Sequence, residues 1–199
     1  MSCRIPAFTA SCGPPTSLGR SNTMPVIAPL PMEEIDDESR ARIAAGQATG
    51  MYSQTLPLQV MARAPAALRA MDEGYKAMFR RSLLDDRLRE LLRIRSAQLN
   101  GCGPCSQSRK ETDVAESDVA CLIDPDAGSY SRRERLALQF LVRLCTEPDA
   151  ITPTTYVELA EAFSVAEIVE LGWTCAQTMA GHRFMHTLDL LGDGEAVLG

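Results

Sequence analysis

The sequence predicts an all-α fold of about seven helices over residues 32–199, preceded by a disordered or extended tail over residues 1–31. Three observations support this prediction. Apolar residues recur at spacings of three and four along most of the chain, as one face of a helix requires. Residues that favour helix ends stand at the limits of these segments. No segment alternates apolar and polar residues as a half-buried β-strand would.

The first half of the predicted domain opens with two helices separated by a proline-rich turn. Residues 32–46 begin with acidic side chains and end at Gly46, an order that complements the helix dipole. Pro57 and Pro65 indicate a turn and then a helix start. Residues 65–81 place five large side chains at spacings of three and four: Leu68, Met71, Tyr75, Met78 and Phe79.

The next helix, within residues 82–101, carries clear signals at both ends. Asp85 fits the N-cap position, and Asn100-Gly101 form a C-cap pair. Its shared apolar face contains Leu84, Leu88, Leu91 and Leu99. We expect this segment to be a core helix.

The second half of the chain continues the helical pattern, with connections of ordinary length. Further helices are expected just after Cys105, at 116–123, at 131–145, at 151–163 with Pro153 early, and at 164–192. Ser164 and Glu167 form a capping box at the start of the last and longest helix.

The composition disfavours several classes of function. The chain is 45% apolar and carries a net charge of −6, so a nucleic acid partner is not expected. No apolar run approaches the roughly 20 residues that span a bilayer. The tail lacks acidic residues and a continuous apolar region, so we expect no secretory signal and a cytoplasmic protein. It weakly resembles a transit peptide, but a disordered extension or a natural start at Met24 is the simpler interpretation.

Seven cysteines are many for an intracellular chain, and their odd number does not suggest a secreted disulfide framework. Cys3 and Cys12 lie in the tail. Three others lie in apolar helical patterns and are expected to be small buried side chains: Cys121, Cys145 and Cys175. The remaining two form the motif Cys102-Gly-Pro-Cys105.

This motif also occurs in thioredoxins, but its surroundings differ here. A thioredoxin motif follows a β-strand, whereas Cys102 follows a helix of about four turns and no Trp precedes it. The motif therefore lies at the N-terminus of a following helix, where unpaired N–H groups and the dipole lower a cysteine pKa. Cysteines three residues apart can close a disulfide that is easily reopened, so the motif predicts a redox dithiol.

The segment LRELLRIRSAQLNGCGPCSQSR resembles the core motif of the carboxymuconolactone decarboxylase superfamily. The resemblance is to its alkylhydroperoxidase D-like (AhpD-like) branch. That motif is Glu, eleven residues, Cys-x-x-Cys, three residues and His. In this sequence eleven residues separate Glu90 from Cys102. The resemblance covers roughly residues 25–193, and it implies an all-α fold that assembles as trimers or hexamers.

The resemblance also implies reduction of hydroperoxides, or electron transfer as a thiol–disulfide carrier. In that scheme Cys105 attacks the peroxide and becomes a sulfenic acid. Cys102 supplies a proton and then closes the disulfide, and Glu90 supports a proton relay through water. By analogy with thioredoxin, the first cysteine, Cys102, would be the more reactive one. Either cysteine therefore remains a candidate for the attacking thiol in disulfide exchange. Helix geometry alone would also allow a surface ion pair between Glu90 and Arg89 or Arg93.

The family's histidine position holds Arg109 here, which cannot exchange a proton near neutral pH. Arg109 lies one turn after Cys105, where it could stabilise a thiolate or be an ordinary solvated side chain. His182 or His186, on the last helix, could replace the missing histidine. A zinc site formed by these histidines and the dithiol is not expected, because 76 residues separate Cys105 from His182. Helix packing or a subunit interface is the simpler interpretation of both histidines.

We therefore predict a homo-oligomeric thiol-dependent peroxidase or thiol–disulfide oxidoreductase that uses no metal or cofactor. Its partners would be a hydroperoxide and a thiol or disulfide reductant. The predicted site residues are Cys105, Cys102 and Glu90, with Arg109 and His182 as secondary candidates. Two alternatives stay open: a decarboxylase-type enzyme on the same fold, which needs no Cys-x-x-Cys, and a non-enzymatic redox-sensing or interaction module.

Overall fold

The computed structural model describes residues 25–126, 128–191 and 195–199. These residues form nine α-helices and one 3-10 helix, and their β structure is a single isolated bridge, which confirms the predicted all-α class. The α-helices are α1 (Asp37–Ala48), α2 (Leu56–Met61), α3 (Pro65–Arg80), α4 (Asp86–Leu99), α5 (Gly103–Gln107), α6 (Glu116–Cys121), α7 (Arg132–Thr146), α8 (Pro153–Ala160) and α9 (Val165–Thr187). Among the described helices, none is both long enough and apolar enough to cross a membrane.

Two elements near the N-terminus differ from the prediction. α1 begins at Asp37 and not near Met32, because the side chain of Asp36 accepts a hydrogen bond from the backbone N–H of Ser39 (2.9 Å) and caps the helix there. α2 is a helix of six residues where the sequence indicated only a turn. Its proline, Pro57, lies in the first turn, where the missing N–H leaves no hydrogen bond unmade.

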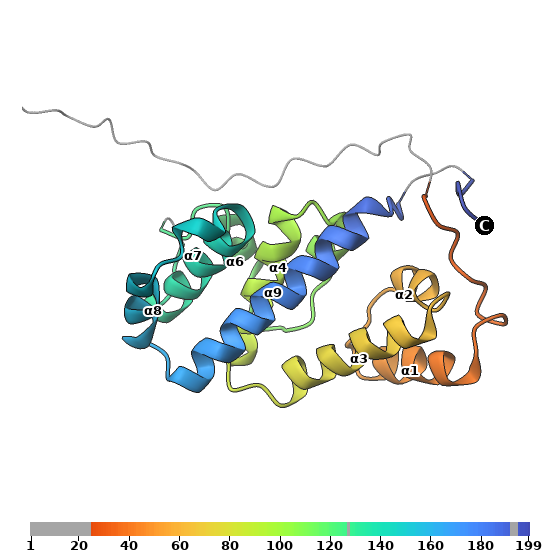
Figure 1. The fold of residues 1–199 in the computed structure, drawn as a ribbon, viewed down its shortest axis with the longest axis horizontal. Coiled ribbons are helices and arrows are strands. Elements are labelled where there is room, and N and C mark those ends of the chain that lie inside the picture. The colour runs from red at the N-terminus through yellow and green to blue at the C-terminus, as the bar shows by residue number, and fades with distance from the viewer. Residues whose placement is uncertain (1–24, 127, 192–194) are drawn as a thin grey trace, which may run out of the picture.

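α4 is the central helix of the molecule (Figure 1). It packs against α7 and α9 and also contacts α5 and α6. Leu91, Leu92 and Ile94 are each 0% exposed, although successive residues point to different sides of a helix. α4 is therefore buried around most of its circumference, and not along the single leucine face that the spacing predicted.

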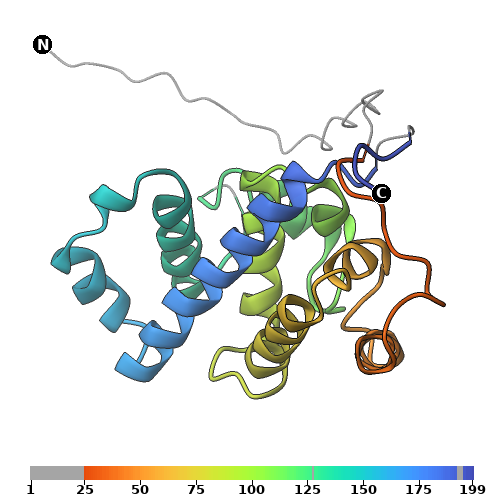
Figure 2. The ribbon, with the colours of Figure 1, turned by 45° about the vertical axis from the view of Figure 1, so that its right-hand side comes forward.

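Helices α1, α2 and α3 form a second, smaller layer with its own core of buried side chains. That core contains Ile35, Ile43, Leu58, Ala62 and Leu68. Figure 2 shows this layer beside α4 and α9. The loop between α1 and α2 and one face of α3 are thereby positioned to form one wall of a pocket.

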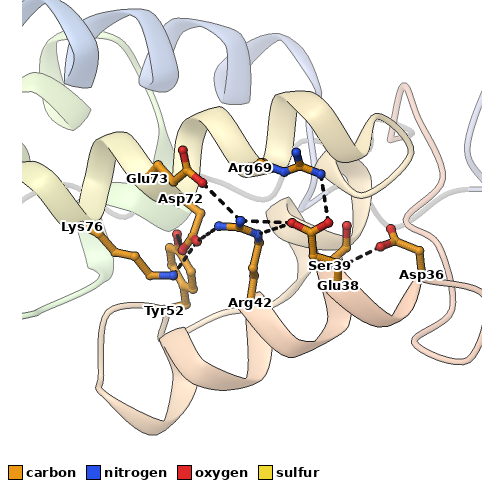
Figure 3. A network of polar contacts seen from close by, with 9 residues as sticks. All are labelled: Asp36, Glu38, Ser39, Arg42, Tyr52, Arg69, Asp72, Glu73 and Lys76. Carbon is orange, nitrogen blue, oxygen red and sulfur yellow. Dashed lines mark hydrogen bonds and ion pairs between the residues drawn. The ribbon is translucent and has the colours of Figure 1, made fainter.

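Asp72 on α3 connects the parts of this second layer (Figure 3). Its carboxylate is fully buried and accepts hydrogen bonds from Tyr52 (2.9 Å), Arg42 (2.9 Å) and Lys76 (2.5 Å). Burial alone would raise the pKa of Asp72, but the hydrogen bonds from Lys76, Arg42 and Tyr52 lower that pKa below its ordinary value. The network joins α1, α3 and the loop that follows α1.

The described part of the predicted tail, residues 25–31, runs beside the end of the chain. The backbone N–H of Ala28 donates to the carbonyl of Leu198 (2.7 Å), and the N–H of Leu198 donates to the carbonyl of Val26 (3.0 Å). Residues 1–24, which include the two tail cysteines, lie outside the described residues.

Two of the cysteines predicted to be buried are free thiols inside the main core. They are Cys145 and Cys175, and burial raises the pKa of both thiols. Such shielded thiols are poor candidates for redox chemistry. Cys121 differs from the prediction because it is only half-buried, at the edge of the same core.

We predict that Asp72→Asn lowers the free energy of unfolding by about 3 kcal/mol at pH 7, because Arg42 and Lys76 lose a buried counter-ion. The folded-state pKa of Asp72 lies below its unfolded value, so the stabilisation is present above about pH 4 and is lost as the pH falls further. Urea unfolding at pH 7 and pH 3 measures both effects. The matched control is Asp37→Asn, whose 97% exposed carboxylate should contribute little. Equal losses in the two variants would contradict the prediction.

Candidate functional site

The two motif cysteines lie where α4 ends and α5 begins. Gly101 ends α4 with a φ of +67°, a conformation that favours glycine. Cys102 is the N-cap residue of α5 and forms a disulfide with Cys105, with a Cα–Cα distance of 5.3 Å. This confirms the predicted position of the dithiol between two helices. α5 has only five residues, so its dipole is weaker than the sequence suggested.

The two cysteines differ in access to solvent. Cys102 is 2% exposed, whereas Cys105 is half-buried and lines a pocket of about 120 Å³. Most of the apolar pocket lining comes from the second layer and from α9: Met51, Pro57, Leu58, Met71 and Met185. A small apolar molecule in this pocket would therefore meet Cys105 before Cys102.

Glu90 lies in α4 and is 0% exposed. Its carboxylate accepts two hydrogen bonds from Arg93, at 2.7 and 2.8 Å, and a third from the backbone N–H of Lys110 at 2.8 Å. The ion pair with Arg93 that helix geometry allowed is thus formed, but it is buried and not on the surface.

Arg93 connects the Glu90 carboxylate to the cysteine segment. Its guanidinium donates to the backbone carbonyls of Cys105 (2.7 Å) and Ser108 (2.6 Å). The Glu90–Arg93 pair therefore holds the backbone of residues 105–110 against α4, with Glu90 as the acceptor and Arg93 as the donor. This arrangement fixes where the Cys105 sulfur lies in the pocket.

The two histidines of α9 lie in different surroundings. His182 lines the pocket, is 2% exposed, and its Nδ1 lies 3.0 Å from the hydroxyl of Ser96. Burial, and next the positive charges of Arg93 and Lys110, lower the pKa of His182 to about 3. Its imidazole is therefore neutral near pH 7. His186 is exposed outside the pocket, and its Nδ1 lies 3.0 Å from the carbonyl of Gly101.

Arg109 does not line the pocket. Its guanidinium forms two hydrogen bonds with Glu116, at 2.7 and 2.9 Å, and donates to the carbonyls of Ser106 and Ser108. The hydrogen bond with Glu116 raises the pKa of Arg109 further. The position that the family pattern gives to histidine is thus occupied by a side chain bound outside the pocket.

The sequence prediction missed Lys110, which also lines the pocket. Its Nζ lies 4.9 Å from the ring centres of Tyr75 and Phe79 and 5.8 Å from that of Tyr52. Burial, and next the charge of Arg93, lower its pKa to about 8. No helical spacing signals this contact, because tertiary packing alone brings the three rings to the lysine.

In the described part of the chain, no group of three or more His, Cys, Asp or Glu side chains is placed to hold a metal ion. The formal set of two cysteines and two histidines does not converge. The cysteines are joined to each other, while His182 and His186 contact Ser96 and Gly101 separately.

Comparisons with known proteins agree with the family resemblance. Residues 65–113, which span α3, α4 and the cysteine motif, match the model of the carboxymuconolactone decarboxylase family. A search of curated proteins gives no match.

Two solved structures share the fold. One is an uncharacterized peroxidase-related protein from Ralstonia eutropha JMP134 with an alkylhydroperoxidase AhpD core. It has a TM-score of 0.68 and 18% identity over 81% of this chain and 90% of that chain. The other is the debrominase Bmp8 in its apo form, with a TM-score of 0.64 and 18% identity over 85% and 91% of the two chains. The family match and the shared fold both agree with the resemblance that the sequence predicted: residues 65–113 are similar to the carboxymuconolactone decarboxylase family, and the two solved structures have the same fold as this chain.

Proposed function

We propose that the protein is a thiol-dependent peroxidase that reduces organic hydroperoxides with Cys105 and Cys102. One observation carries the proposal: Cys105, which is disulfide-bonded to Cys102, lines a largely apolar pocket of about 120 Å³, and Arg93 holds its backbone carbonyl. Because the backbone already places the two cysteines for a disulfide, the bond can open and close again without a large movement of the chain.

The difference in exposure supports Cys105 as the attacking thiol. Its thiolate attacks the terminal oxygen of the hydroperoxide and the O–O bond breaks, so that Cys105 becomes a sulfenic acid and the departing alkoxide takes up a proton to become an alcohol. The thiol of Cys102, buried beside it, then attacks the sulfenic sulfur, so that the disulfide forms and water leaves. A dithiol reductant restores the two thiols and becomes a disulfide itself.

Glu90 acts in this proposal chiefly as a positioning residue. Its carboxylate is saturated by Arg93 and by the Lys110 N–H. This hydrogen bonding makes Glu90 an anchor for the cysteine segment. A relay through water remains compatible with its position beneath that segment.

The recessed position of Cys105 favours a small dithiol over a folded protein disulfide as the reaction partner. A protein thiol would need to reach a half-buried cysteine in the lining of a pocket. The debrominase with the same fold indicates that this architecture is not limited to peroxide chemistry, so turnover must be tested directly.

We also propose that the protein is a homo-oligomer. Val165, Val169 and Trp173 lie four residues apart on α9 and are 77%, 68% and 66% exposed. Such an apolar stripe on a helix surface is typical of a protein interface.

We predict that Cys105→Ser lowers hydroperoxide turnover at least about 100-fold, because the attacking sulfur is lost. Cys102→Ser should accumulate a sulfenic acid on Cys105 that a dimedone-type probe labels, as measured by mass spectrometry. Cys145→Ala is the control, since that thiol lies outside the pocket, and it should retain full turnover. Label that survives in Cys105→Ser but is lost in Cys102→Ser would reverse the assignment.

We predict that Glu90→Gln lowers the free energy of unfolding by about 3 kcal/mol, because Arg93 is left buried without a counter-ion. Turnover should fall at least about tenfold as the cysteine segment loses its anchor. Chemical unfolding and steady-state kinetics measure the two effects. Glu116→Gln, which removes an exposed ion pair with Arg109, should change both quantities little. Wild-type turnover in Glu90→Gln would contradict the positioning role.

We predict that Arg109→Ala keeps hydroperoxide turnover within about twofold of the wild type, because Glu116 holds the guanidinium outside the pocket. Steady-state kinetics with cumene hydroperoxide and a dithiol provides the measurement. A tenfold loss in a variant with unchanged thermal unfolding would instead assign Arg109 to thiolate stabilisation.

A further inference from the structure

Lys110 is a half-buried cation in the pocket, and the proposed roles of the cysteines and Glu90 do not explain it. Among the described residues, its Nζ has no hydrogen-bond acceptor and no carboxylate at ion-pair distance, and it lies over the aromatic rings of Tyr52, Tyr75 and Phe79. Burying an ammonium without a counter-ion is costly, even with cation–π contacts. A position of this kind in a reactive pocket often has a chemical use.

The ammonium and the reactive sulfur are positioned by the same ion pair. Glu90 accepts a hydrogen bond from the backbone N–H of Lys110 (2.8 Å). Its partner Arg93 donates one to the backbone carbonyl of Cys105 (2.7 Å). Both side chains then line one pocket. Hydrogen bonds from α4 therefore hold the backbone of both residues.

Cleavage of a hydroperoxide by a thiolate releases an alkoxide, which needs a proton. Arginine side chains do not act as proton donors near neutral pH, and the guanidinium of Arg93 is engaged in hydrogen bonds with Glu90 and two backbone carbonyls. His182 is neutral near pH 7, and burial raises the pKa of Tyr52 and of Tyr75 above the ordinary value. Among these groups, only Lys110 carries a proton that it can release near neutral pH, since its pKa is about 8.

We propose that Lys110 is the proton donor of the peroxide-cleaving step, with its ammonium protonating the alkoxide that leaves as Cys105 attacks. This role rests on the proposed peroxidase function. It gives a reason for the half-buried cation, and it supplies the acid that Arg109, held by Glu116, does not provide.

The protons and electrons balance over one cycle. The Cys105 thiolate takes the terminal oxygen, the O–O bond breaks, and the alkoxide takes a proton from Lys110 to become the alcohol. The Cys102 thiol and the sulfenic acid then give the disulfide and water. When the dithiol reductant reopens the disulfide, the Cys105 thiol returns a proton to the neutral amine of Lys110. The pair is again a thiolate and an ammonium.

The pH dependence follows from the groups around Lys110. Burial and Arg93 of α4 lower its pKa, Glu90 of α4 and Glu111 raise it, and neutral His182 and Tyr75 face it from α9 and α3. A thiolate on Cys105 of α5 would also favour the ammonium. Because the donor is the protonated form, the rate constant of peroxide cleavage should fall as the pH rises through and above about 8.

The test compares two oxidants with different leaving groups. Cumene hydroperoxide releases an alkoxide that needs a proton, whereas peracetic acid releases acetate, which does not. Stopped-flow measurement of a single turnover by the fully reduced protein gives the rate constant for each. Lys110→Met should lower the rate constant for cumene hydroperoxide about 100-fold and that for peracetic acid less than about threefold. The decline of the cumene hydroperoxide rate constant above about pH 8 should disappear.

Lys110→Arg is the matched variant, because it keeps the positive charge but cannot release a proton in this range. It should show the same selective loss with cumene hydroperoxide. Equal slowing of both oxidants in either variant would make Lys110 a structural residue, and unchanged rates would remove it from the reaction. A wild-type protein that reduces neither oxidant would instead refute the peroxidase function itself.

Discussion

Two opposite charges, Glu90 and Arg93, lie one turn apart inside the central helix, and the arrangement of the site depends on them. Buried charges are tolerated when they are paired and fully hydrogen-bonded. Glu90 accepts from Arg93 and from the Lys110 N–H, while Arg93 also donates to the carbonyls of Cys105 and Ser108. The pair thus provides hydrogen-bond partners for these three backbone groups in and just after the short helix α5, which would otherwise need water.

The same ion pair influences the charge state of the pocket. Arg93 is a fixed positive charge in a region that excludes water, so it disfavours further protonation nearby. Together with burial, it lowers the pKa of His182 to about 3 and that of Lys110 to about 8. Positive charges near a reduced cysteine favour its thiolate, and Arg93 and Lys110 line the same pocket as Cys105.

The second layer of helices completes the pocket from the opposite side. Tyr52 lies in the loop after α1, where its hydroxyl donates to the buried carboxylate of Asp72 (2.9 Å) while its ring faces Lys110. The ion-pair network of α1 and α3 in Figure 3 therefore orients one wall of the pocket as well as stabilising the layer. Met51, Pro57, Leu58 and Met71 make much of this wall apolar, which fits the organic hydroperoxide of the proposed function.

The sequence by itself determined the helical class, the caps at Asp85 and Ser164, the cysteine pair after Gly101, and the register of Glu90. These features depend on residues a few positions apart, and helix geometry relates such residues directly. Only the tertiary structure decided the rest: that Glu90 is buried and not on the surface, that Arg109 lies outside the pocket, and that Lys110 lies inside it among aromatic rings. The reason is physical, since the surroundings of a side chain are set by helices distant in sequence, whose packing no local spacing encodes.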